Sequence, residues 1–459
     1  MSTDLILQNE IVGLLKEALE RISSLQNFYK TQKRAIDAAA KAGMDRNRLG
    51  FEIDLYCNIL VGDYDEAKKD KDFCKFEEKI LSQVEIIESN SENGRGHVSF
   101  RYRDLEALVA QKIDLNVKTA TAAFKQFADM PIIHGDNALI MLITRFEEFL
   151  SSFFTMLYFM YPQKYLDTQQ IAFSEIIDKG IDEVRDTIVS REIESLMRKS
   201  YTEWFDLLKT HGILLANCQD EIDLLKEAYA RRNILVHNAG VVNSSYLKNV
   251  LSSSAKVGDK LNASEAYLDR AFSAVQIIIF TIHIEAAKLI KDKAVDYISK
   301  VFDTAFDWLQ KGEYHLSKSV FKSIYTSKYA DSITRQMAQV NYWIAKSEED
   351  GVESIKEDVA AFDVLSLQSI FSVAKELLLQ NFDKADTLIE ELYKKEDIYS
   401  YMIEEWPLFK NYRATEYYAD FKEKHAAGFA IATAETHSGE LTDTIADDIC
   451  DSKEQDLDA

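Results

Sequence analysis

The chain has 459 residues and 47% hydrophobic content, enough for two to four domains of ordinary size. Only 15 glycines and 3 prolines occur, too few for the many tight turns of a β-sandwich, a barrel or a doubly wound sheet. The 77 acidic and 54 basic residues give a net charge of −23, which excludes a protein that coats nucleic acid with its whole surface. We therefore expect an all-α protein in which any contact with nucleic acid depends on a local basic patch.

The sequence also indicates a cytoplasmic protein that does not enter a membrane. The longest uncharged runs, residues 149–163 and 271–284, are too short to cross a bilayer. The N-terminal MSTDLILQNE is acidic where a signal peptide would be basic. Four cysteines lie far apart without a CxxC pair, so we expect neither a zinc site nor a disulfide framework.

Residues 1–136 are expected to form a helical N-terminal domain. Apolar periodicity predicts helices over residues 45–67 and 73–88, among others. The Asn, Ser and Gly residues of 89–96 predict a loop. A proline and a glycine in residues 129–136 predict the end of the domain.

Residues 137–296 are expected to form a bundle of four to six helices. Residues 138–161 are apolar on nearly every side, so this helix should be buried. Further helices are predicted around residues 173–199, 201–210, 220–236 and 263–291, with an irregular stretch over 240–260.

Residues 297–425 show a pattern of helix pairs joined by similar turns. The turns lie at 311–314, 350–353 and 380–383, with spacings near the 34 residues of tetratricopeptide repeats. The region resembles a short helical solenoid, a fold that holds peptides or partner proteins. The remaining residues, 426–459, contain nine acids and one lysine, and we expect an acidic, disordered tail.

One segment, residues 229–238, combines side chains suited to RNA cleavage and reads YARRNILVHN. Asn233 and His237 are four residues apart and share a helix face, and the long side chain of Arg232 can reach toward it. Histidine exchanges protons near neutral pH, and arginine binds phosphate and stabilises developing negative charge. Because RNA supplies its own 2′-hydroxyl nucleophile, this set needs no metal. A hydrogen-bonded structural histidine at a helix end is the alternative interpretation.

The same residues resemble the Arg-x4-6-His signature of the HEPN superfamily. Arg232-Asn233-xxx-His237 matches it, including the polar residue after the arginine. LITRFEEFLSSFF resembles the first HEPN helix, and AYARRNILVHNAGVVNSSYL resembles the motif helix and following turn of the RiboL-PSP-like ribonucleases. The resemblance covers about residues 137–291.

The resemblance implies roles for individual residues. Arg232 and His237 would be catalytic, with Asn233 as a polar assistant. Glu147 or Glu148 would orient the arginine; the alternative is that both are ordinary exposed helix charges. HEPN sites are usually formed by two subunits, so the resemblance also implies a homodimer.

A local basic segment follows the motif. Residues 231–260 contain five basic residues and one acid, and Arg231, Lys248 and Lys256 are predicted to contact RNA. A solvated polar loop is the alternative. No Walker, GxGxxG, HExxH or GxSxG motif occurs, and the other histidines lack metal-ligand spacing, so no cofactor or metal is expected. Among them, His211 could lie near the motif helix.

Two functions follow as hypotheses. The first is a metal-independent HEPN endoribonuclease, which the resemblance associates with toxins and anti-phage defence effectors. The second is a non-catalytic HEPN-type protein that binds RNA or nucleotide, with a helical repeat that recruits a protein partner.

Overall fold

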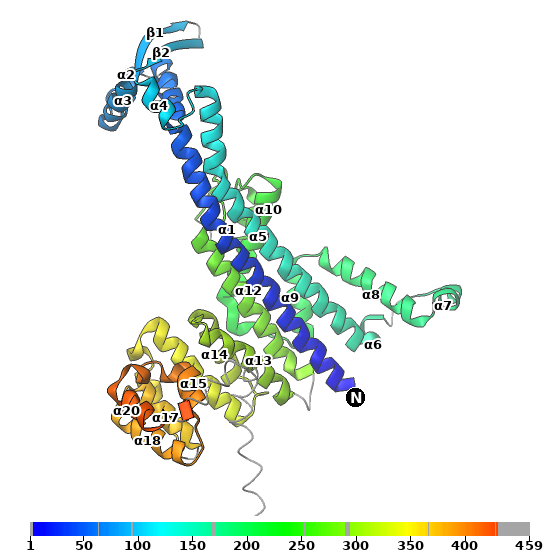
Figure 1. The fold of residues 1–459 in the computed structure, drawn as a ribbon. Coiled ribbons are helices and arrows are strands. Elements are labelled where there is room, and N and C mark those ends of the chain that lie inside the picture. The colour runs from blue at the N-terminus through cyan, green and yellow to red at the C-terminus, as the bar shows by residue number, and fades with distance from the viewer. Residues whose placement is uncertain are drawn as a thin grey trace, which may run out of the picture. The chain divides into compact units, whose positions relative to one another are not determined.

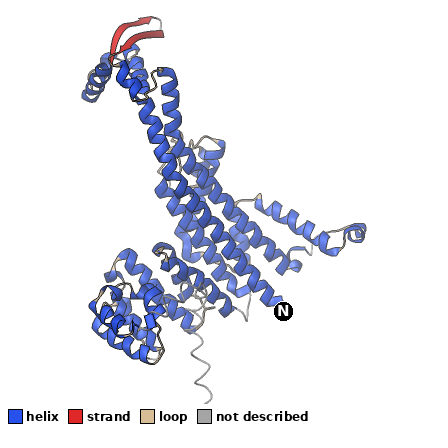
Figure 2. Cartoon of the chain, viewed as in Figure 1, coloured by secondary structure: helices blue, strands red, loops and turns tan. Residues whose placement is uncertain are grey.

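The computed structural model describes residues 3–62, 64–92, 95–166, 170–250, 254–289, 294–365, 367–426 and 428–429. Within these ranges every element is a helix except one two-stranded hairpin, drawn red in Figure 2. The predicted all-α class is therefore confirmed.

The chain forms two compact units, and both are discontinuous in sequence. The motif unit comprises residues 23–143 and 228–269, and the acidic unit comprises residues 1–22, 144–227 and 270–459. The motif unit has 22 basic and 22 acidic residues and no net charge. The acidic unit has 32 basic and 55 acidic residues and accounts for the whole charge of −23.

These units do not follow the predicted boundaries after residues 136 and 296. The physical reason is that long helices continue from one unit into the other, so a unit cannot be one continuous piece of chain. These helices are α1 (Thr3–Val61), α5 (Val117–Met160), α10 (Gln219–His237) and α12 (Glu265–Ala286).

In the motif unit α1 and α5 run antiparallel at close distance (Figure 1). A Cβ atom added to Gly50 would lie 2.3 Å from the Cβ atom of Ala120, so the glycine allows close backbone approach. The rings of Phe51 and Phe124 stack with their centroids 4.3 Å apart. The helix predicted to begin at residue 45 is thus the interior of a much longer one.

A hairpin replaces part of a predicted helix. The prediction of helix over residues 73–88 is wrong after residue 83, where β1 begins. Val84 pairs with Tyr102 and Ile86 with Phe100, so apolar side chains alternate with polar ones at the strand period of two. They pack on a cluster that includes the buried Ile53. The elements here are α2 (Tyr64–Ala67), α3 (Lys71–Gln83), β1 (Val84–Glu92), β2 (Arg95–Tyr102) and α4 (Leu105–Ala110).

Residues 129–136, which were predicted to end the N-terminal domain, do not interrupt the chain's helix, because Pro131 and Gly135 lie inside α5. A Cβ atom on Gly135 would lie 2.4 Å from the carbonyl oxygen of Ala263, so the glycine allows a close backbone contact. The next residue, Asp136, accepts a 2.7 Å hydrogen bond from the Ala263 N–H. The segment docks another part of the motif unit, and this packing offsets the roughly 3 kcal/mol cost of a proline within a helix.

The acidic unit is built from α1 and α5 segments and a series of shorter helices. The helix predicted over 173–199 is interrupted at Gly180, which has a φ of 82°. These helices are α6 (Pro162–Leu166), α7 (Phe173–Lys179), α8 (Ile181–Met197), α9 (Tyr201–Thr210) and η1 (Ala216–Cys218).

The C-terminal helices have turns at the predicted positions. Gly312, Gly351 and Gln380 have positive φ values of 77°, 87° and 60°, and each follows a helix. Trp406 donates a 3.0 Å hydrogen bond to the buried Asn341, which joins distant parts of this region. The tetratricopeptide interpretation stays a prediction. The main helices are α13 (Ala294–Gln310), α14 (Tyr314–Tyr325), α15 (Ser332–Asp350), α17 (Ser369–Leu378), α18 (Phe382–Lys394), α19 (Ser400–Glu405) and α20 (Glu416–Lys424).

The predicted tail begins too early. Phe429 is only 5% exposed, and its ring lies 6.2 Å from the rings of Tyr418 and Phe421. Burial of this aromatic side chain makes residues 426 and 428–429 part of the fold. The rest of the predicted disordered tail, residues 430–459, lies outside the described residues.

One helical stretch of the described chain, Glu265–Leu289, is long and apolar enough to cross a membrane by length and composition. Of its most apolar part, 78% is buried inside the protein, as in the core helix of a bundle.

Candidate functional site

The motif residues Arg232, Asn233 and His237 lie together in the last two turns of α10. Asn233 and His237 are exposed and share one face of the helix. Arg232 is half-buried; its Nη1 donates to Oδ1 of Asn233 over 3.3 Å, and its guanidinium lies 5.8 Å from the Tyr229 ring centroid. The structure thus brings the guanidinium and the amide together and leaves the imidazole open to solvent.

The end of the motif helix is fixed by its backbone. Ala239 and Gly240 adopt left-handed φ values of 50° and 78°, and the N–H of Gly240 donates to the carbonyl of Ile234 over 3.0 Å. A Cβ atom at Gly240 would lie 2.6 Å from the carbonyl oxygen of Leu261, so only glycine fits without a shift. The Leu261 N–H in turn donates to the Gly240 carbonyl over 2.9 Å. This contact closes the following loop onto the helix three residues after His237.

That loop has its own small apolar core. It contains α11 (Ser244–Asn249), and the N–H of Val242 donates to the carbonyl of Asp259 over 2.8 Å. Burial of several apolar side chains stabilises this arrangement by roughly 1.5–3 kcal/mol for each one fully buried. The cluster consists of Ala230, Ile234, Val242, Tyr246 and Val250.

The three predicted RNA-binding residues differ in their surroundings. Lys248 and Lys256 are exposed on the loop after the motif helix. Arg231 is half-buried; its Nη1 donates to the carbonyl of Asn262 over 2.6 Å, and its guanidinium lies 4.0 Å from the Tyr267 ring centroid. Arg231 therefore anchors α10 to the start of α12.

The two predicted supporting carboxylates are not in the motif unit. Glu147 and Glu148 lie on the part of α5 that belongs to the acidic unit. Oε2 of Glu148 lies 2.8 Å from Nη1 of Arg145 and 3.4 Å from Nη1 of Arg21. These ion pairs account for the charge of Glu148 without Arg232.

His211 belongs to a polar cluster that sequence reasoning did not find. Its Nε2 contacts the Tyr165 hydroxyl and lies 3.2 Å from Nζ of Lys164, and both partners belong to α6. Burial, assisted by the charge of Lys164, lowers the pKa of His211 to about 4. The imidazole is therefore neutral at pH 7, and its contacts are structural ones within the acidic unit.

His283 is a second histidine in the acidic unit with a structural role. It is fully buried on α12 against the rings of Phe149 and Phe153, and its Nδ1 lies 2.8 Å from the Tyr297 hydroxyl. Burial lowers its pKa to about 3. The apolar residues around His283 in the sequence indicate that it is buried, whereas nothing in the local sequence identifies Tyr297 as its hydrogen-bond partner.

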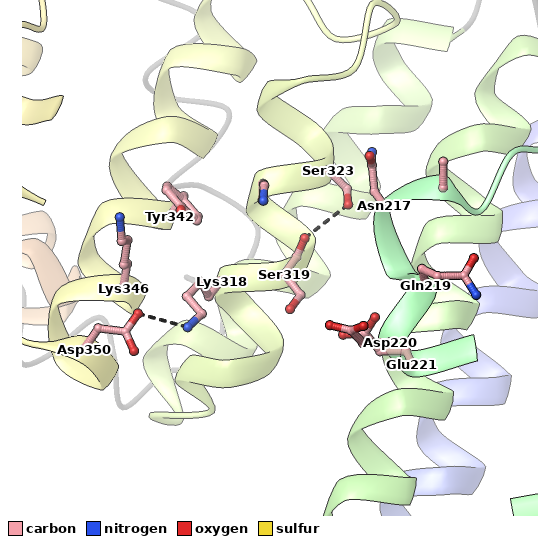
Figure 3. A pocket seen from close by; sticks show the side chains of 12 residues that line it. Asn217, Gln219, Asp220, Glu221, Lys318, Ser319, Ser323, Tyr342, Lys346 and Asp350 are labelled. Carbon is pink, nitrogen blue, oxygen red and sulfur yellow. Dashed lines mark hydrogen bonds and ion pairs between the residues drawn. The ribbon is translucent and has the colours of Figure 1, made fainter. Parts of the chain in front are cut away.

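A polar pocket of about 480 Å³ also lies in the acidic unit (Figure 3). The start of α10 faces α14 and α15 across it, and Nζ of Lys318 pairs with Asp350 over 3.2 Å. No predicted site residue lines the pocket, and its walls carry charges of both signs. These are Lys318, Lys322 and Lys346, and Asp220, Glu221 and Asp350.

Among the described residues, no group of three or more His, Cys, Asp or Glu side chains is placed to hold a metal ion. Three cysteines in the described ranges, Cys57, Cys74 and Cys218, are free thiols. No family model matches the chain, and no curated protein and no solved structure matches it.

Proposed function

We propose that the protein is a metal-independent endoribonuclease of the HEPN type. The observation that supports this best is the exposure of His237 beside Asn233 and Arg232 on a helix with a fixed end. A structural histidine would be buried or hydrogen-bonded, as His283 is. The imidazole of His237 makes no hydrogen bond with any residue of the described ranges, which favours a role toward an external substrate.

The chemistry assigned to the motif is transesterification. His237 accepts the 2′-hydroxyl proton while the 2′-oxygen bonds to the adjacent phosphorus and the bond from phosphorus to the 5′-oxygen breaks. Arg232 stabilises the additional negative charge on the phosphoryl oxygens, and Asn233 donates a hydrogen bond to one of them. The 5′-oxygen leaves with a proton from a second acid. The products are a 2′,3′-cyclic phosphate and a 5′-hydroxyl.

A second copy of the chain supplies that acid in this proposal. Each motif contains one histidine, and an isologous interface would place His237 of the partner subunit across the same cleft. Light scattering at micromolar protein should then give twice the mass of one chain. A fully active monomer would contradict the composite site.

The test compares cleavage of total RNA by the wild-type protein, a His237→Ala variant and a His315→Ala control. His315 is an exposed histidine of the acidic unit, so the control removes an imidazole outside the motif. We expect His237→Ala to reduce the rate by about 10²–10⁴-fold, with the control near the wild type. Wild-type cleavage should persist in EDTA and leave a cyclic phosphate. Loss of activity in EDTA would reject the metal-independent mechanism.

The proposal includes a cellular role as a toxin or anti-phage effector. Expression should then arrest growth, and His237→Ala should relieve the arrest. The alternative is a binding module that recruits a partner through the C-terminal helices. Equal RNA binding by both proteins, with no cleavage by either, would support that alternative.

A further inference from the structure

The outer face of α1 in the motif unit carries a row of basic residues. Arg34, Lys41 and Arg48 are spaced by seven residues, so they nearly align along the helix, and all three are exposed. We call these three residues the basic stripe. Lys41 and Arg48 each stand two residues before a glycine that packs against α5, Gly43 and Gly50. Two residues correspond to about 200° of rotation, so the stripe faces away from α5.

The acidic neighbours of the stripe are largely neutralised by lysines outside it. Asp37 pairs with Lys33, and Glu52 lies 2.6 Å from Nζ of Lys79. Asp45 remains, 3.3 Å from Arg48.

The other two members of the stripe have no such partner. Arg34 and Lys41 form no ion pair with any residue in the described part of the chain. Residues 30–48 contain six basic and two acidic side chains, hence a local charge of +4 within a unit of zero net charge.

The stripe begins where the motif helix is anchored. Nζ of Lys33 lies 3.3 Å from Glu265, and Nζ of Lys30 lies 3.4 Å from Asp269, at the start of α12. Arg231 of the motif helix binds the same segment. The stripe and the motif are therefore tied to one short stretch, residues 262–269, within a single compact unit.

We propose that the basic stripe is a second contact surface for RNA, which holds the phosphate backbone of a strand whose other part lies at the motif. This inference rests on the proposed function and adds to it an RNA-binding surface outside the HEPN-like region. Arg34 and Arg48 are 14 residues apart, which corresponds to roughly 21 Å along the helix. Contacts with phosphates carry no base information, so the stripe raises affinity without selecting a sequence.

The experiment measures binding of a labelled 30-nucleotide oligouridine to full-length His237→Ala protein, which does not consume the probe. The test variant adds Arg34→Gln, Lys41→Gln and Arg48→Gln. The control adds Lys69→Gln, Lys71→Gln and Lys75→Gln, which removes the same charge from exposed positions in the same unit. Circular dichroism checks that both variants keep the helical content of their parent.

We expect the stripe variant to bind at least about tenfold more weakly at 50 mM salt. The slope of log affinity against log salt should fall by about 2, since each phosphate contact with a single strand contributes about 0.7. The control should change both quantities much less. Equal affinity and equal slope in the two variants would overturn the inference. So would a parent protein that binds no oligouridine.

A second arm uses labelled polyglutamate, because an acidic protein is the other partner that a basic surface can attract. Binding of polyglutamate as tight as that of RNA would reassign the stripe and overturn the proposal. Failure of the proposed function is a separate result, since it shows as absent cleavage by the protein with His237 intact.

Discussion

The two compact units differ most clearly in charge. The acidic unit holds the whole net charge of −23, whereas the motif unit is neutral and presents the basic stripe and the exposed lysines after the motif. The net charge of the whole chain therefore describes neither unit. The total charge argues against binding of nucleic acid only for the acidic unit. The electrostatic potential near the motif depends instead on the charged residues around it.

Individual histidines of the two units also differ in burial. The acidic unit keeps His211 and His283 neutral by burial, while His237 in the motif unit is exposed. Histidine content by itself thus says little about catalysis. Burial decides which imidazole a substrate can reach.

The largest effect is expected from two adjacent arginines of the motif unit. Arg232→Ala should reduce the rate of RNA cleavage by about 10²–10³-fold, because the charge stabilising the transition state is lost. Arg231→Ala should instead lower the free energy of unfolding by about 1–2 kcal/mol, because its contacts with Asn262 and Tyr267 are structural. Cleavage assays and urea denaturation of both variants measure the contrast. A larger loss of activity in Arg231→Ala than in Arg232→Ala would reverse the assignment.

The next effect concerns the backbone that holds the motif helix. Gly240→Ala should lower the free energy of unfolding by about 3 kcal/mol, since it combines a left-handed φ with a clash at the Leu261 carbonyl. Gly258→Ala is the matched control, because it has a φ of 96° but no atom within 4 Å of the added Cβ. It should cost about 1 kcal/mol. Equal losses in thermal or urea unfolding would show that the close contact contributes nothing.

The next prediction concerns the effect of acid pH on stability, which depends on the buried His283. The unfolded chain protonates His283 near its ordinary pKa of 6.5, and the folded protein resists protonation down to about 3. The stability due to this shift is complete above pH 6.5 and is lost as pH falls toward 3. Between pH 6.5 and 4.5 the loss is about 2 kcal/mol, and His283→Leu should remove that part of the pH dependence.

Urea denaturation at the two pH values checks this expectation. The control is His237→Leu, which removes an exposed imidazole from the motif unit by the same substitution. The same pH slope in wild type and His283→Leu would contradict the role assigned to burial.

The smallest expected effect is electrostatic. Deletion of residues 430–459 removes a net charge of −8 and should strengthen RNA binding a few-fold at low salt, an effect that fades as the Debye length shortens to about 8 Å at 0.15 M. Deletion from residue 426 should also destabilise the fold by about 2 kcal/mol, because Phe429 is lost. RNA titrations and thermal unfolding of both truncations separate the effects. Unchanged affinity at every salt concentration would exclude competition between these residues and RNA.

The sequence by itself determined the helical class, the motif helix and the turns between the C-terminal helices. These are local properties: apolar side chains at helical spacing, few turn residues, and glycine where φ becomes positive at Gly312 and Gly351. It also placed Arg232, Asn233 and His237 on one helix. Asn233 and His237 are four residues apart and share a helix face whatever surrounds them, and the long side chain of Arg232 can reach toward that face.

Only the tertiary structure showed which of the residues noted in the sequence make contacts with distant parts of the chain. Gly135 was expected to mark the end of a domain, but it allows the close approach of Ala263 inside α5. Arg231 was expected to contact RNA, and the structure shows it in contact with Asn262 and Tyr267. Residues 45–48 were expected to start a helix, but they lie within α1. Two glycines of α1 pack against α5, so the basic stripe faces away from α5. The physical reason is that periodicity is set by neighbours in sequence, while the environment of each side chain is set by residues that only folding brings near.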